Sequence, residues 1–244
     1  MIKPVIGITP DRSGTPDNIE AHFFIRRNYC AAVAECGGMP LVLPYQIDLA
    51  DQYLDLVDGI ILTGGMFDID PVAYGMAAQY PGKMILKEDR TLFERAILRG
   101  ALARNMPVLG ICGGMQLIAV EMGAKLFQHI PSDIDTQIEH KQSVPCDLGA
   151  HRISVRKDTR LHQILRVDTC TVNSLHHQSV MEESALVRVA AVADDGVIEA
   201  IEVAERPFCI GVQWHPEYLV NVWERNIFIE LVKAAKNTSK SFFK

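Results

Sequence analysis

One stretch organises this chain, and it reads Pro107-Val108-Leu109-Gly110-Ile111-Cys112-Gly113-Gly114-Met115-Gln116-Leu117. Its apolar first part stops at a cysteine between glycines, and apolar residues then resume at Met115 and Leu117. This pattern predicts a buried strand, a sharp turn and a helix. A strand-to-helix turn with a reactive side chain at its tip is a nucleophile elbow, and here the tip is Cys112.

The glycines around Cys112 have a physical purpose. A nucleophile at such a tip is usually held in strained backbone, so its neighbours must be small to let helix and strand approach each other. We expect Gly110, Gly113 and Gly114 to provide that room. The N-terminus of the following helix favours a thiolate, the form of cysteine that attacks a carbonyl carbon. Taken alone, the motif is equally consistent with a small, buried and unreactive cysteine.

Composition narrows the classes of function. The chain has 244 residues, is 48% hydrophobic and carries a net charge of −6, so we expect one domain over residues 1–244. A negative chain lacks the electrostatic footprint for nucleic acid or an anionic membrane, which favours small-molecule chemistry. Its apolar runs are too short for a signal peptide or a membrane span, and we expect a cytoplasmic protein.

The six cysteines predict neither disulfides nor a metal site. They lie at positions 30, 36, 112, 146, 170 and 209, form no C-x-x-C pair and have no zinc-like spacing with the eight histidines. We therefore expect free thiols, no metal and no cofactor.

Continuous apolar runs in the first half predict parallel strands covered on both faces, at residues 5–9, 40–44 and 59–63. Helical patterns occupy residues 21–36, 49–56 and 88–105. Gly64 and Gly65 follow the third strand at its carboxyl end, where open α/β sheets bind their substrates. A plain glycine turn is the alternative for this pair.

The second half of the chain has a different hydrophobic pattern. Residues 128–149 are polar and aperiodic, which indicates a long loop or lid. Alternating patterns predict antiparallel strands at residues 151–156, 186–193 and 197–203, and a buried strand at 208–214 precedes a final helix at 221–235. The predicted fold class is α/β, with an open, mostly parallel sheet, helices on both faces and a small antiparallel β portion in the C-terminal half.

A base and its orienting acid follow the last buried strand. Pro216 biases His215 toward extended backbone, and residues two apart in extended chain project to the same side. Glu217 can then hydrogen-bond one imidazole nitrogen and leave the other free to serve Cys112. A surface histidine and a solvated acid at a helix start are the alternatives.

Four motifs in this order resemble the class I glutamine amidotransferases, whose fold is flavodoxin-like, and within them most closely the γ-glutamyl-γ-aminobutyrate hydrolases. These are Thr63-Gly64-Gly65, Gly110-Ile111-Cys112-Gly113-Gly114-Met115-Gln116, Asn173-Ser174-Leu175-His176-His177-Gln178 and Gly211-Val212-Gln213-Trp214-His215-Pro216-Glu217. The resemblance covers nearly the whole chain and implies that Cys112 is the nucleophile, His215 the general base and acid, and Glu217 the residue that orients it.

The resemblance also implies a substrate site. The backbone N–H groups of Gly65 and Gly113 would form the oxyanion hole. Gln116 and the backbone around His177 and Gln178 would contact the glutamyl end of the substrate, although the two adjacent histidines suit buried structural roles equally well. Gly113 departs from the hydrolases, which usually have a bulky basic residue after the nucleophile. We expect a side chain there to be tolerated unless the backbone angle is one that only glycine adopts.

Three functions follow as hypotheses. The first is a free-standing hydrolase that cleaves a γ-glutamyl amide through a γ-glutamyl thioester. The second is a glutaminase subunit that delivers ammonia to a separate synthase, and the third is a catalytically silent binding protein. The expected partner is a small-molecule γ-glutamyl substrate; a homodimer is compatible with the first hypothesis, and a synthase subunit belongs to the second.

Overall fold

A nine-stranded sheet runs through the computed structural model, which describes residues 2–238. Five neighbouring strands are parallel, in the order β4 (Met39–Val42), β1 (Val5–Ile8), β5 (Gly59–Leu62), β6 (Val108–Ile111) and β13 (Cys209–Val212). Four antiparallel strands continue the sheet, namely β12 (Ile198–Val203), β11 (Val187–Ala193), β8 (His151–Val155) and β9 (Thr169–Val172). The predicted mostly parallel sheet with an antiparallel C-terminal portion is confirmed.

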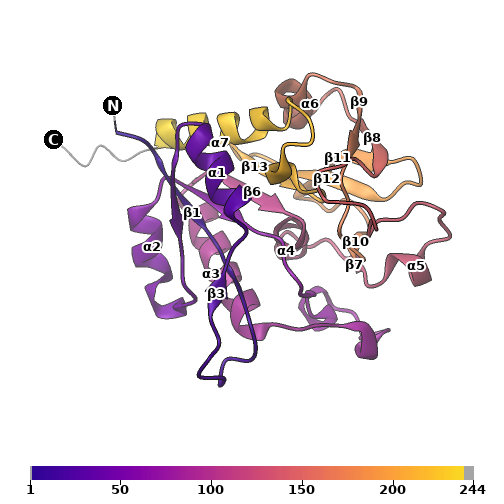
Figure 1. Cartoon of the computed structure of the whole chain (residues 1–244), viewed down its shortest axis with the longest axis horizontal. Helices are drawn as coiled ribbons and strands as arrows, with labels where there is room; N and C mark the ends of the chain where they lie inside the picture. Colours follow the sequence, from indigo (N-terminus) through magenta and orange to yellow (C-terminus); the bar gives the residue numbers. More distant parts are fainter. Residues whose placement is uncertain (1, 239–244) are drawn as a thin grey trace.

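Helices cover both faces of the sheet (Figure 1). One layer holds α1 (Arg27–Glu35), α6 (Arg160–Leu165) and α7 (Arg225–Thr238), and the other holds α2 (Ala50–Leu56), α3 (Glu88–Ala103) and α4 (Gly113–Glu121). Strand β5 shows why its sequence is apolar throughout. Ile60 and Leu62 pack into one layer while Ile61 packs into the other, so every position is buried.

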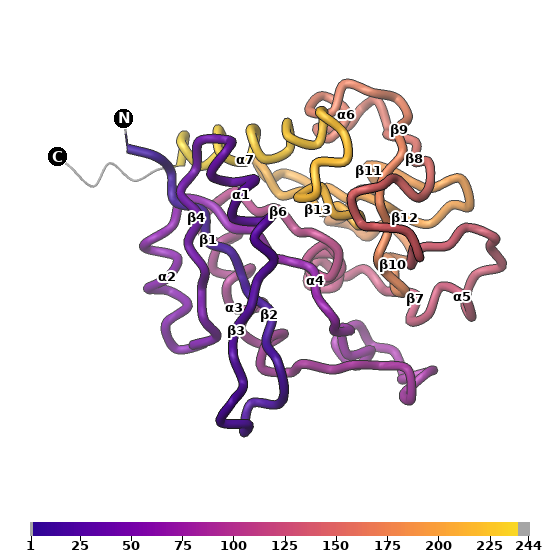
Figure 2. Tube along the Cα trace, viewed as in Figure 1, coloured from indigo at the N-terminus to yellow at the C-terminus, as the bar shows by residue number. Residues whose placement is uncertain are grey.

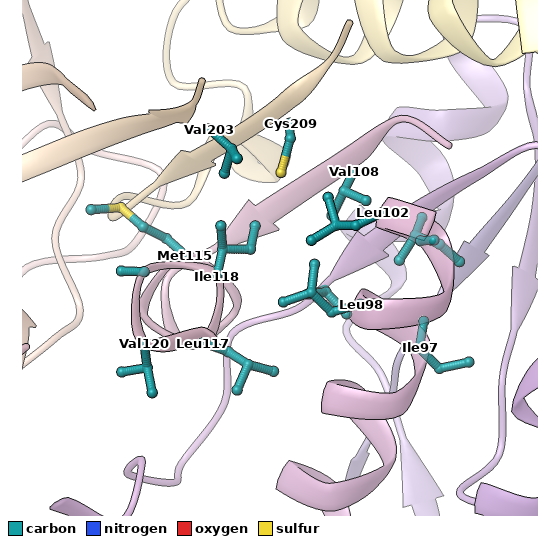
Figure 3. Close-up of a cluster of buried hydrophobic side chains, with 14 of the residues drawn as sticks. Ile97, Leu98, Leu102, Val108, Met115, Leu117, Ile118, Val120, Val203 and Cys209 are labelled. Carbon is teal, nitrogen blue, oxygen red and sulfur yellow. The ribbon is translucent and has the colours of Figure 1, made fainter. Parts of the chain in front are cut away.

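The elbow helix α4 is buried almost all round. In Figure 3, Met115 and Ile118 of α4 lie near Cys209 of the sheet, and Leu98 of α3 belongs to the same cluster. Every residue from Gly113 to Val120 is buried. A helix enclosed in this way holds the turn before it in a fixed position.

The strand order explains where a site forms. From β1 the chain first adds β4 on one side and then returns to add β5 on the other, so the order reverses between β1 and β5. Open α/β sheets bind ligands at the carboxyl ends of strands near such a reversal. Strands β5, β6 and β13 run parallel and end just before Thr63, Cys112 and Gln213, so the predicted site segments emerge at one edge.

The helix predicted over residues 21–36 is wrong at its start, because α1 begins only at Arg27. Strand β3 (Phe23–Phe24) instead pairs antiparallel with β2 (Asp11–Arg12), and the two run side by side in Figure 2. The backbone N–H of Ser13 also donates to the carbonyl of His22, at 3.0 Å. A backbone already paired in this hairpin cannot also form helical hydrogen bonds.

Smaller differences lie in the second half. The loop predicted at residues 128–149 contains one short helix, α5 (Ile130–Asp133), and is preceded by β7 (Leu126–Phe127), which pairs with β10 (Ser179–Val180). The final helix starts at Arg225 rather than 221. Short 3₁₀ helices span Ile47–Leu49, Pro71–Tyr74, Pro81–Lys83 and Pro216–Tyr218. Within residues 2–238, none of the helices has the length and hydropathy needed to cross a bilayer.

Candidate active site

Cys112 has the strained backbone predicted for the tip of an elbow. Its φ is 53° and its ψ is −110°, a combination that costs a non-glycine residue about 1–3 kcal/mol. Its N–H donates to the carbonyl of Val212 at 2.8 Å, which ties the elbow to β13. Helix and strand approach closely here, since a Cβ on Gly114 would lie 2.1 Å from the carbonyl oxygen of Leu62. The prediction that glycines give the elbow its room is confirmed.

His215 and Glu217 form the predicted pair. His215 Nδ1 lies 2.8 Å from Glu217 Oε1, and because a carboxylate only accepts, Nδ1 carries the proton. Glu217 is 2% exposed. A Cβ on Gly64 would lie 2.9 Å from His215 Cε1 and 3.0 Å from Cys112 Cβ, so this glycine packs between the ring and the cysteine. The three predicted catalytic residues therefore lie together at one sheet edge.

Charges around His215 favour its protonated form. Burial lowers the pKa of His215, but the charges of Glu217 and Cys112, together with hydrogen bonds to both, outweigh it and raise the pKa to about 10. The imidazole is therefore a cation at neutral pH. A cation next to a sulfur stabilises the thiolate.

Two residues for which the sequence predicted no role, Asn173 and Tyr29, hold the backbone of His215 and of Gly64 in place. Asn173 Oδ1 accepts from the backbone N–H of His215 at 2.8 Å, and its Nδ2 donates to the carbonyl of the same residue at 3.0 Å. The hydroxyl of Tyr29 accepts from the N–H of Gly64 at 3.2 Å. Burial and the nearby charge of Glu217 raise the pKa of Tyr29, so its hydroxyl keeps its proton. Neither residue carries a local sequence signal beyond membership of a motif or an amphipathic helix.

A buried arginine holds the glycine turn after β5. Arg90 Nη2 donates to the carbonyls of Thr63 and Gly64, at 2.7 and 3.1 Å, and to Glu94 Oε1 at 3.1 Å. Its side chain is fully buried, and its guanidinium lies 3.9 Å from the centre of the Phe67 ring. In the sequence Arg90 looks like a solvated charge on an amphipathic helix, so sequence reasoning missed it.

Two cavities meet at Cys112. The larger, of about 460 Å³, is lined by Cys112 and by all five residues predicted for the oxyanion hole and substrate, namely Gly65, Gly113, Gln116, His177 and Gln178. The smaller, of about 170 Å³, is lined by Cys112 and His215 together with Arg26, Tyr29 and Lys141. Cys112 is therefore accessible from both cavities, and His215 lines the smaller cavity.

Several groups at the predicted glutamyl site already have partners within the protein. Gln116 Nε2 donates to the carbonyl of Gln178 at 3.0 Å, and the carbonyl of His177 accepts from the N–H of Ile130 at 2.7 Å. The ring of His177 is partly exposed, with Nε2 2.7 Å from the buried Asp68 carboxylate. A substrate would therefore meet side chains and N–H groups at His177 and Gln178 rather than carbonyls. Asp68 was not anticipated from the sequence.

Gly113 is confined by a side chain rather than by its backbone. Its φ lies outside the left-handed region, so an L-residue is compatible with the main chain. A Cβ there would lie 2.9 and 3.0 Å from Cε1 and Cζ of Phe67. The obstacle to a side chain at this position is the Phe67 ring and not the glycine-only backbone angle considered from the sequence.

One group of buried side chains beside the larger cavity has the composition of a metal site. His140, His151 and Glu199 are all buried and bring potential ligand atoms within 4.8 Å of one another. Spacing in the sequence does not reveal this group, because its members are scattered over 60 residues. All six cysteines, in contrast, are free thiols as predicted.

Comparison with known families agrees with this geometry. The family model described as peptidase C26 matches residues 4–217. The chain belongs to the peptidase C26 family. The resemblance to class I glutamine amidotransferase-like proteins seen in the four motifs is thereby confirmed, and as a family member the chain is a hydrolase that acts on carbon–nitrogen bonds.

Alignments with individual relatives span most of this peptidase C26 family member. A glutamine amidotransferase-like protein of Rickettsia prowazekii is 36% identical, over 96% of this chain and 98% of its own. The γ-glutamyl-γ-aminobutyrate hydrolase PuuD of Escherichia coli is 32% identical, over 89% of this chain and 87% of its own. The glutaminase domain of Trypanosoma brucei CTPS has the same fold, with a TM-score of 0.63 and 16% identity over 98% of this chain and 96% of that one.

Proposed function

We propose that this protein is a cysteine hydrolase that cleaves a γ-glutamyl amide through a γ-glutamyl thioester. The observation that supports it best is the chain of contacts from Glu217 through His215 to Cys112, at the point where two cavities meet. A base, an orienting acid and a nucleophile in contact are what acyl transfer needs. Similarity to γ-glutamyl-γ-aminobutyrate hydrolases supports the same substrate class. A cytoplasmic location stays a prediction from the sequence.

The first half-reaction forms the thioester. The Cys112 thiolate attacks the γ-carbonyl carbon, and the electron pair of the C=O bond moves to oxygen, where the N–H groups of Gly65 and Gly113 stabilise it. Collapse of this intermediate breaks the C–N bond. His215 Nε2 gives its proton to the departing nitrogen, so the amine leaves neutral.

The second half-reaction uses water. His215, now neutral, takes one proton from a water molecule whose oxygen attacks the thioester carbonyl. The C–S bond breaks, the thiolate of Cys112 is restored and the glutamyl product leaves as an acid. Glu217 stays ionised throughout and stabilises the imidazolium each time it forms.

The two cavities support a placement of the two ends of the substrate. The leaving nitrogen must take its proton from His215, so the amine lies in the smaller cavity, where His215 is. The glutamyl part then occupies the larger cavity with Gln116 and Gln178. Arg26 lines only the smaller cavity and Lys141 lines both, and cations there favour an amine that itself carries a carboxylate.

A matched pair of substrates tests the preference for an amine that carries a carboxylate. γ-Glutamyl-γ-aminobutyrate and γ-glutamyl-butylamine have similar chains, and only the first ends in a carboxylate. We expect kcat/KM to be higher for the first by about 10-fold or more, since a charge-assisted contact contributes about 1.5–3 kcal/mol. Arg26→Gln should shrink the difference. Equal rates for the two amides in the unaltered protein would refute the carboxylate preference while leaving the hydrolysis itself intact.

The nucleophile is tested separately. Cys112→Ala should abolish glutamate release without unfolding the protein, since a smaller side chain still fits the elbow. Cys36→Ala, a half-buried cysteine at the end of α1, is the matched control and should retain the rate. A folded Cys112→Ala protein that still turns over would remove this residue from the mechanism.

A further inference from the structure

A second cluster of titratable side chains lies beside the larger cavity. It consists of Glu199 on β12, His151 at the start of β8, His140 in the loop over residues 128–149, and His176 after β9. All four side chains are buried, with Glu199 fully inaccessible. No step of the proposed reaction uses them.

The cluster is built around one carboxylate oxygen. Glu199 Oε1 lies 3.0 Å from His151 Nε2, 3.3 Å from His140 Nδ1 and 3.5 Å from His176 Nε2. The rings of His140 and His151 are 4.8 Å apart between centres, and those of His140 and His176 are 5.0 Å apart. Three imidazole nitrogens thus converge on a single acceptor.

A hydrogen bond on the far side of the His176 ring decides which of its two nitrogens lacks a proton. His176 Nδ1 lies 2.9 Å from the carbonyl of Gln178, which can only accept, so Nδ1 carries the hydrogen and Nε2 presents a lone pair. His140 Nε2 lies 2.9 Å from the Asp195 carboxylate and donates to it in the same way.

The lone pair of His176 consequently faces a carboxylate oxygen with no hydrogen between them. Among the described residues, four buried atoms of this cluster have no hydrogen-bond partner, namely His176 Nε2, His140 Nδ1, His151 Nδ1 and Glu199 Oε2. Unpaired buried polar atoms are costly, and a cation between His176 Nε2 and the Glu199 carboxylate would satisfy both acceptors.

We propose that these four residues bind one Zn²⁺ ion. Zinc takes imidazole nitrogen at about 2.0–2.1 Å and carboxylate oxygen at about 2.0–2.2 Å, so neighbouring ligand atoms of a tetrahedral site lie roughly 3.3 Å apart. The three nitrogen-to-oxygen distances of 3.0, 3.3 and 3.5 Å surround that value. Asp195 and the Gln178 carbonyl occupy the places of the outer hydrogen-bond partners that orient metal-bound histidines.

Four protein ligands leave no open position, so the ion is structural. It joins the loop over residues 128–149 to strands β8 and β12 and to the segment that leads into His177 and Gln178. Because His140 and His176 also line the cavity beside Cys112, the ion holds one wall of that cavity in place. The ligands come from four separate segments, which is why spacing rules do not detect them.

Metal binding to a variant without the catalytic thiol tests the proposal. The full chain with Cys112→Ala is stripped with a chelator and titrated with Co²⁺ and then Zn²⁺, so that a metal on the thiolate is not counted. We expect one Co²⁺ per chain with the intense visible absorption of four-coordinate cobalt, and displacement by one Zn²⁺. Zinc should also raise the melting temperature, since it binds only the folded state.

Variants locate the ion. In the same Cys112→Ala chain, His151→Gln and His176→Gln should each weaken Co²⁺ binding by more than about 100-fold, and Asp195→Asn by about 10- to 100-fold. His162→Gln is the matched control, because His162 pairs with Asp168 near the surface, at 2.8 Å, and should leave binding unchanged.

Metal binding to the Cys112→Ala chain, which keeps all four proposed ligands, is decisive even if a ligand variant fails to fold. A folded Cys112→Ala protein that binds neither ion stoichiometrically, or that gives only the weak spectrum of six-coordinate cobalt, overturns the zinc site and means that protons alone balance Glu199. Unchanged cobalt binding in the folded His151→Gln and His176→Gln proteins overturns it equally.

Discussion

The two glycines after the nucleophile should respond very differently to the same one-carbon addition. At Gly113 a Cβ would meet the edge of the Phe67 ring at 2.9 Å, and at Gly114 it would meet the carbonyl oxygen of Leu62 at 2.1 Å. The ring edge can shift by a few tenths of an ångström. The carbonyl belongs to the central strand β5 and cannot move without breaking the sheet.

The magnitudes follow from these contacts. Overpacking against a side chain costs about 1–3 kcal/mol, and the greater helix propensity of alanine returns up to about 1 kcal/mol. We therefore expect Gly113→Ala to lose about 1 kcal/mol of unfolding free energy and about 2–4 °C in melting temperature. Gly114→Ala should lose more than about 4 kcal/mol, which places it among the severe substitutions.

Thermal and urea unfolding of both variants measure the difference, and a double-mutant cycle identifies its cause. If the Phe67 ring is the obstacle, Phe67→Leu should cost at least about 0.5 kcal/mol less in the Gly113→Ala protein than in the wild type. An additive cycle would refute the contact, and similar losses for the two glycine variants would refute the distinction between ring and backbone. Glutamate release by Gly113→Ala, assayed in parallel, shows whether a side chain at position 113 is compatible with catalysis.

Two further predictions concern the pair of base and orienting acid. Glu217→Gln should lower kcat by on the order of 10²- to 10⁴-fold with little change in KM, because an amide holds the ring but cannot stabilise the imidazolium; steady-state hydrolysis measures this, and a wild-type rate would make Glu217 merely structural. The raised pKa of His215 predicts loss of activity as pH rises through about 10. Because that pKa is raised from 6.5, the imidazolium adds stability that is complete below about pH 6.5 and is lost as pH rises toward 10. Unfolding of wild type and His215→Asn across this range should converge at the alkaline end, and a constant difference between them would contradict the charge assignment.

Local patterns carried most of what the sequence predicted correctly. The elbow at Cys112 and the pair of His215 and Glu217 are recognisable because their residues are close in the chain and the chemistry needs those types at that spacing. The parallel strands follow from continuous apolar runs. These features depend on short-range geometry, which a sequence displays directly.

Long-range pairing accounts for what the sequence did not reveal. Residues 21–26 have a helical pattern, but hydrogen bonds to residues 11–13 override it. Arg90 has the sequence pattern of a solvated charge, but its side chain is buried and donates to the carbonyl of Thr63, directly after β5. Glu199 looks like one more acid on an alternating strand until the fold surrounds it with three histidines. Each depends on partners in another segment of the chain, 9 or more residues away.

The hydrogen bond from Arg90 to the Gly64 carbonyl has a consequence for control of the enzyme. The C=O of Gly64 and the N–H of Gly65 belong to one planar trans peptide and point in opposite directions. As long as the buried guanidinium holds that oxygen, the N–H is aimed away from Arg90, and rotating the peptide would forfeit a charge-assisted bond of about 1.5–3 kcal/mol. In the proposed role of Gly65 as an oxyanion donor, this N–H would need no activating subunit to turn it, which is what the proposed free-standing hydrolase requires.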